Sequence, residues 1–122
     1  METRELLSAL RKRPGLLGLD GSFGQYCAFV EGMNAARDGQ LLAGFRELLI
    51  TRLGDGNNLT WPALLRRLAG GGEPDDAVLV PLLFDTLDGF LERQARPGGL
   101  LQVYDDYLSW LKAQSWYRPP TR

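Results

Sequence analysis

The 122-residue sequence predicts an all-α fold: a compact bundle of five to six helices with short loops, forming a single domain over residues 1–122. Three observations lead to this prediction. Apolar residues recur at helical spacing along the whole chain. No segment sustains the period-two alternation of a strand. Clusters of glycine and proline separate the periodic segments at short intervals.

The first helix is expected over residues 3–12, with Thr3 as its N-cap and Pro14 ending it, because the residue before a proline avoids the helical region. The segment 14–21 then reads as a loop, since it holds three glycines and one proline. We expect this loop to lie against the core because of its leucines, Leu16, Leu17 and Leu19.

A second helix should open at Ser22, which forms a capping box with Gln25, and should stop at Gly39. Gly32 in its interior costs about 1 kcal/mol relative to alanine, which predicts a closely packed neighbouring helix there. The buried stripe of this helix is expected to consist of Phe23, Tyr26, Cys27, Val30 and Met33.

A third helix is predicted over residues 40–53, ended by Gly54, and a turn follows at residues 55–58. Thr60 should cap a fourth helix that ends at the three glycines 70–72. The buried residues expected in these two helices are Leu41, Leu42, Phe45, Leu48, Leu49, Trp61, Leu64, Leu65 and Leu68.

The fifth helix is expected between Asp75 and Ala95. Pro81 either kinks it or marks a continuous part that begins near Leu79. Its core face should consist of Val80, Leu83, Phe84, Leu87, Phe90 and Leu91.

A last helix is predicted over residues 100–116, followed by a flexible tail at about 118–122. The residues expected to be buried along it are Leu101, Tyr104, Leu108 and Leu111.

The side-chain inventory argues against catalysis. The chain has no histidine and a single cysteine, Cys27, so it lacks the Ser–His or Cys–His pair of a nucleophilic enzyme and any His-ligated zinc site. Cys27 lies on an apolar stripe and is expected to be a buried structural thiol. We therefore expect no enzymatic activity, no cofactor and no metal. The absence of a membrane-length apolar run and of a leader segment favours a cytoplasmic protein without a membrane partner.

Charge is unevenly distributed although the net charge is only −1. Residues 73–106 hold eight acids against two arginines, which argues against a nucleic-acid partner and favours a basic protein partner. A solvated surface is the alternative.

Within this half, Asp85, Asp88 and Glu92 share one face of the fifth helix. A magnesium site would draw carboxylates from facing helices, so this row is expected to be solvated or to contact a partner. Asp105 and Asp106 diverge by about 100° on the last helix, so at most one of them could join a shared site.

Aromatic residues crowd the last helix. Tyr107 is expected to pack in the core, whereas Trp110 and Trp116 could pack inward or anchor an interface.

Four segments of the first 70 residues resemble a family of small helical bacterial proteins, some of which are immunity proteins of polymorphic or interbacterial toxins. The segments are Arg13-Pro14-Gly15-Leu16-Leu17-Gly18, Phe29 to Ala36, Phe45 to Arg52, and Asn58-Leu59-Thr60-Trp61. The resemblance implies a domain that neutralises a cognate protein toxin by covering its active site.

The acidic half gives this expectation a physical form, because carboxylates could occupy the basic cleft of a toxin that acts on nucleotides or nucleic acid. The expected partner-binding residues are Asp85, Asp88, Glu92, Asp105, Asp106, Trp110 and Trp116. The alternatives are a helical adaptor or self-associating structural module, in which the aromatics of the last helix form a homodimer seam, and a metal-dependent enzyme that uses the carboxylate row.

Overall fold

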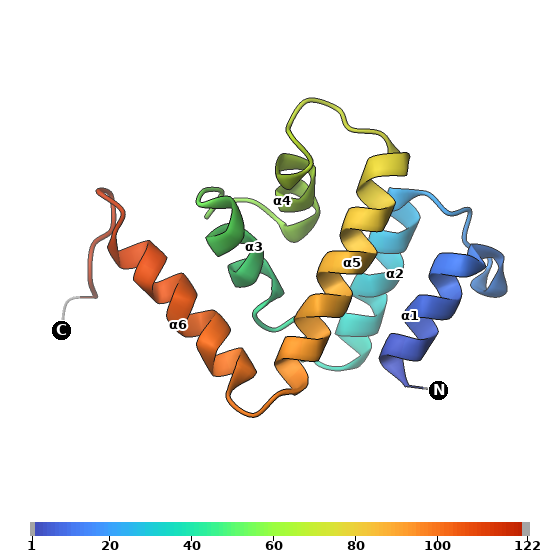
Figure 1. Cartoon of the computed structure of the whole chain (residues 1–122), viewed down its shortest axis with the longest axis horizontal. Coiled ribbons are helices and arrows are strands. Elements are labelled where there is room, and N and C mark those ends of the chain that lie inside the picture. The colour runs from blue at the N-terminus through green and yellow to red at the C-terminus, as the bar shows by residue number, and fades with distance from the viewer. Residues whose placement is uncertain (1, 121–122) are drawn as a thin grey trace.

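The computed structural model describes residues 2–120 and confirms the all-α prediction: within that range every regular element is a helix. Six α-helices and one short 3-10 helix follow one another along the chain (Figure 1). Their bounds are α1 Thr3–Lys12, η1 Pro14–Leu17, α2 Phe23–Ala36, α3 Phe45–Leu53, α4 Trp61–Leu68, α5 Asp76–Ala95 and α6 Gly99–Lys112.

Helix α5 is the centre of the molecule. It runs between α1 and α2 on one side and α3 and α4 on the other, and α6 turns back from its end (Figure 1). The side chains that it buries are Leu79, Leu83, Phe84, Thr86, Leu87, Phe90 and Leu91. All of these except Thr86 join the apolar faces of the other helices in one contiguous core.

The start of α5 settles the question raised by Pro81. The Asp75 carboxylate accepts a hydrogen bond from the backbone N–H of Val78 at 3.3 Å, so the helix begins at Asp76 and continues through Pro81. Proline removes the N–H that would pair with the carbonyl of Ala77. Because Ala77 is exposed, water can bind that carbonyl instead.

The capping box at the start of α2 is confirmed in one half only. The Ser22 hydroxyl accepts from the N–H of Gln25, as predicted. The Gln25 side chain instead accepts from the N–H of Asp20 at 2.7 Å, because the Asp20 carboxylate already takes the N–H of Ser22 at 2.8 Å.

Helix α3 is shorter than predicted. Residues 41–44 form turns, and the helix begins at Phe45 after Gly44, whose φ of 92° is incompatible with helix. The turns are held by side chains, since the Asn34 amide oxygen accepts from the N–H of Leu42 at 2.9 Å. Leu42 is nevertheless buried, so the predicted core position is right while the predicted helix start is wrong.

The predicted core stripe of the last helix is wrong. Leu101, Tyr104 and Leu108 are 75%, 36% and 43% exposed, and the face that packs inward carries Leu100, Val103, Tyr107 and Trp110. Both stripes have helical spacing, and their centres lie about 110° apart around the helix. The helix also ends at Lys112 rather than near residue 116.

Three smaller expectations are also wrong. Leu16 and Leu17 of the 14–21 segment are each 55% exposed, and only Leu19 packs against the core. No helix packs closely at Gly32, where an added Cβ would meet nothing within 4 Å. The N-cap of α1 is Glu2, so Thr3 is the first helical residue.

Of the predicted tail at 118–122, residues 121–122 lie outside the described range.

Candidate functional site

The most distinctive surface is the outward side of α6. We define the α6 outer face as Leu101, Tyr104, Asp105, Leu108 and Lys112, which recur at steps of three, four and seven and so fall within about 100° of arc. All five are exposed. The outer face therefore combines three large apolar or aromatic side chains with one charge of each sign.

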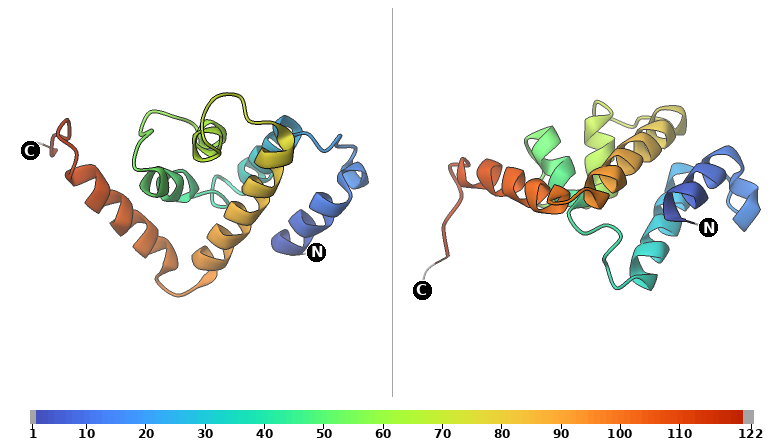
Figure 2. Two further views of the ribbon diagram at one scale, coloured as in Figure 1. Left: turned by 45° about the horizontal axis from the view of Figure 1, so that its top comes forward. Right: turned by 60° about the horizontal axis from the view of Figure 1, so that its bottom comes forward.

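Contacts on the opposite side hold α6 in place. Its close neighbours are α3 and α5, and Figure 2 shows from two further directions that it stands apart from α1 and α2. The Tyr107 hydroxyl donates a hydrogen bond to the Asn57 side chain, and the Arg93 guanidinium donates to the Asp106 carboxylate at 2.9 Å. These contacts hold α6 in place on its inward side and leave its outer face exposed.

Asp105 and Asp106 differ sharply in environment. Asp106 accepts hydrogen bonds from Gln102 at 2.7 Å and from Arg93, and these bonds lower the pKa of its carboxyl. Asp105 and Lys112 have no ion-pair partner among residues 2–120. Only Asp105 of the two acids therefore offers an uncommitted charge at the surface.

The predicted acidic row lies where α1 packs against α5. There Arg4 and Arg11 of α1 form ion pairs with the row, which the sequence did not predict. Arg4 makes a bidentate contact with Asp88, at 2.7 and 3.0 Å. The three closest pairs involving the row are Arg4–Asp88, Arg11–Asp85 at 2.7 Å and Arg96–Glu92 at 2.9 Å. The hydrogen bond from Arg4 lowers the pKa of the Asp88 carboxyl. The row is exposed, but its negative charge is largely offset within the molecule.

The two predicted tryptophans lie near the C-terminal end of α6. Trp110 is partly buried against the core and packs between Tyr107, at a ring-centroid distance of 6.0 Å, and Trp116, at 6.2 Å. Trp116 follows the helix and is 53% exposed. Of the two, Trp116 is the one that presents most of its ring to solvent.

The structure does not bring the seven predicted site residues together. The acidic row lies beside α1, whereas the α6 residues lie at the opposite end of the molecule (Figure 1). Whether any of the seven contacts a partner stays a prediction. Sequence reasoning missed Leu101, Tyr104 and Leu108, which it placed in the core, and Lys112, which it did not single out. A signal was available in the sequence: the apolar residues of α6 form two stripes and occupy a wide arc of the helix. Packing against the core covers only part of such an arc.

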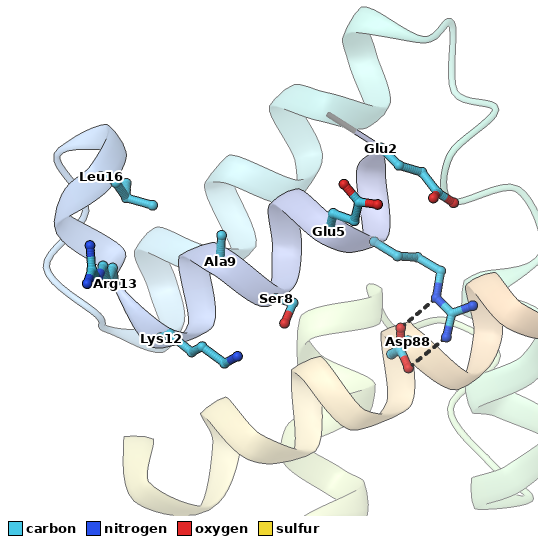
Figure 3. A pocket seen from close by; sticks show the side chains of 9 residues that line it. Glu2, Glu5, Ser8, Ala9, Lys12, Arg13, Leu16 and Asp88 are labelled. Atoms are coloured by element: carbon cyan, nitrogen blue, oxygen red, sulfur yellow. Dashed lines mark hydrogen bonds and ion pairs between the residues drawn. The ribbon is translucent and has the colours of Figure 1, made fainter.

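An open groove of about 660 Å³ runs along the outer side of α1 (Figure 3). Lys12, Arg13 and Leu16 lie at its η1 end, and Glu2 and Glu5 lie at the other end. Among the described residues, no buried side-chain polar atom lacks a hydrogen bond. None of the residues that line the groove is buried, so it has mixed charge and no buried polar group that would orient a small ligand.

Residues from three of the four segments that carry the family resemblance make structural contacts. Arg46 donates hydrogen bonds to the backbone carbonyls of Leu59, at 2.7 Å, and Asn57, which fixes the turn before α4. Trp61 is buried edge-on against Phe45 at 5.7 Å, and its indole N–H donates to the Glu31 carboxylate.

Two features of the described residues bear on metal binding and on thiol chemistry. Residues 2–120 contain no group of three or more His, Cys, Asp or Glu side chains arranged to hold a metal ion. Burial raises the pKa of the Cys27 thiol to about 12, so its nucleophilic thiolate is scarce at neutral pH.

Within the described part of the chain, no helix is both long enough and apolar enough to cross a bilayer. Comparison of the chain with protein-family models, with curated proteins and with solved structures finds no match. The resemblance to immunity proteins accordingly stays a prediction.

Proposed function

We propose that this chain is a non-enzymatic protein-binding protein of the immunity type, which neutralises a cognate toxin in the cytoplasm by laying the α6 outer face across it. The observation that carries the proposal is the exposure of Leu101, Tyr104 and Leu108 on a helix anchored from behind. Clustered apolar side chains beside charged residues are typical of protein contact surfaces.

The proposal moves the contact surface away from the acidic row of α5. A basic toxin cleft would have to displace Arg4 from Asp88 before it could use that charge, and exchanging one exposed pair for another gains little. Asp105 needs no such exchange, and Trp116 lies at the end of the same helix. Asp105 and Trp116 therefore remain proposed contacts, together with Leu101 and Leu108 of the outer face.

The identity of the partner as a toxin is supported only by the four resembling segments. A helical adaptor would use the same face for a different protein, so the two functions differ in the partner and in the consequence of binding. The decisive partner is the product of the neighbouring reading frame, because an immunity gene lies beside its toxin.

The test is growth protection. The neighbouring gene product is co-expressed with the wild-type chain, with the variant Leu101→Glu/Leu108→Glu, and with the control Val78→Glu, which alters an exposed apolar residue at the start of α5. We expect the wild type and Val78→Glu to protect the cells. The double variant should lose protection while its helical circular dichroism is unchanged.

Two results would contradict the proposal. Full protection by the double variant would remove α6 as the contact surface. A neighbouring product that neither harms cells nor binds the purified chain would remove the toxin-neutralising role.

A further inference from the structure

We infer that the α6 outer face binds a second copy of this chain, with the two α6 helices antiparallel and Asp105 of each copy opposite Lys112 of the other. The inference rests on the proposed function only in that both use this face for protein contact. It names the occupant of the face when no toxin is bound, so the second copy and the toxin would compete.

The first argument is the amount of surface that the chain leaves open. A folded monomer of 13.6 kDa is expected to expose about 6,600 Å². This chain exposes 7382 Å², roughly 800 Å² more. The excess belongs to the whole surface, and the exposed side chains of the α6 outer face contribute to it.

The second argument is the order of charges along the helix. Asp105 and Lys112 are seven residues apart on the same face, and neither has an ion-pair partner among residues 2–120. When a helix lies antiparallel to a copy of itself, one two-fold axis brings each Asp105 opposite the other Lys112. Two ion pairs then form from a single face, as a two-fold symmetric interface requires.

The same register also places the apolar side chains of the outer face. The two-fold axis passes beside Leu108, so the two copies of this leucine meet at the centre of the contact. Tyr104 lies at the edge of the face away from Asp105 and Lys112, so it flanks this centre on the side without the ion pairs. Leu101 lies opposite the end of α6, where Trp116 is 53% exposed.

The contact is small because α6 has 14 residues and is about 21 Å long. It lies towards the lower end of stable interfaces, and we therefore expect a weak, reversible dimer. A dimer of this strength would yield to a tighter foreign partner that binds the same face.

Sedimentation equilibrium over a series of micromolar concentrations measures the dissociation constant of the dimer. The wild type is compared with variants in which the charges of Asp105 and Lys112 are reversed. Asp105→Lys places two lysines opposite each other in each pair and should weaken dimerisation by about tenfold or more. Lys112→Asp should do the same with two acids. The double variant Asp105→Lys/Lys112→Asp restores opposite charges and should return to the wild-type dissociation constant within a few-fold.

Cysteine cross-linking tests the register separately. Leu108→Cys should form a disulfide-linked dimer under mild oxidation, because the two introduced thiols meet near the axis. Leu101→Cys should not, and the buried Cys27 of the wild type serves as a background control.

A wild-type chain that stays monomeric through the concentration series overturns the inference. Charge variants that leave dimerisation unchanged, or a double variant that does not recover, overturn the register. Loss of protection by Leu101→Glu/Leu108→Glu in a strictly monomeric protein would leave the proposed function standing and this inference refuted. Charge-dependent dimerisation without protection would do the reverse.

Discussion

Helices α5 and α6 are consecutive in the chain, and both are rich in apolar residues, yet the molecule uses them in opposite ways. Helix α5 is packed by α1, α2, α3, α4 and α6, and it buries seven side chains. Helix α6 has α3 and α5 as its close neighbours, and it buries Gly99 and Val103 fully. The number of neighbours around each helix therefore decides how much of its apolar surface is removed from water.

The comparison also separates two uses of charge. The acids of α5 meet arginines of α1 across a helix seam, so they contribute to the packing of α1. On α6, Asp106 is paired with Arg93, while Asp105 on the outer face is not paired within the described residues. Ion pairs between α1 and α5 hold these two helices together, whereas the unpaired Asp105 on the exposed face of α6 can pair with another molecule.

The largest expected difference between the two helices lies in the cost of removing a leucine. Leu87→Ala on α5 should lower the free energy of unfolding by about 2–5 kcal/mol, because Leu87 is fully buried and its loss leaves a cavity. Leu101→Ala on α6 should change it by less than about 0.5 kcal/mol. Urea denaturation followed by circular dichroism, at concentrations that keep the chain monomeric, measures both values. Equal losses would show that the outer face of α6 is buried in the free molecule.

An intermediate effect is expected at the corner between the two helices. A Cβ on Gly99 would lie 1.8 Å from the carbonyl oxygen of Arg93, so Gly99→Ala should force α6 away from α5 and cost about 3 kcal/mol. Gly98→Ala is the matched control, because Gly98 has a φ of 72° but open space around it. That substitution should cost about 1 kcal/mol through backbone strain alone. Thermal unfolding of the two variants compares them, and a larger loss for Gly98→Ala would contradict the close contact.

The smallest effect is expected at the α1–α5 seam. Asp88→Asn should lower Tm by only about 1–2 °C at neutral pH, because the Arg4–Asp88 pair is exposed. Since the hydrogen bond from Arg4 lowers the folded-state pKa of Asp88, its stabilising contribution is fully present above the unfolded pKa of about 3.9. The contribution is lost as the pH falls through the folded pKa.

The gap in Tm between the wild type and Asp88→Asn should therefore close as the pH falls below about 4. Glu73→Gln, in the loop before α5, is the control and should show no gap at any pH. A gap that widens in acid would contradict the assigned role of Arg4.

Much of the fold could be predicted from local patterns. The hydroxyl of Ser22 caps α2, Gly54 ends α3 in the left-handed region, and the core face of α5 matches its apolar spacing. These features depend on a few neighbouring residues, so the chain itself carries the signal. The start of α3 was missed because the turns before it are held by Asn34 and by Gln94, which lies more than 50 residues away.

The candidate surface was predicted only in part. Asp105 is exposed as expected, and Trp116, for which the sequence left burial and exposure both open, is exposed. The leucines of the outer face were assigned to the core. The arginine partners of the acidic row could not be foreseen either, because Arg4 and Asp88 are 84 residues apart in the chain.

The amino-acid sequence by itself determined that this chain is helical, where most of its helices begin and end, and which residues are apolar. Only the tertiary structure decided which of the two apolar stripes of α6 faces inward, and which acids are already paired. The physical reason is that helix formation depends on contacts within a few residues, whereas burial and ion pairing depend on which distant helix lies alongside. Two stripes of equal spacing on one helix are equivalent until a neighbour covers one of them.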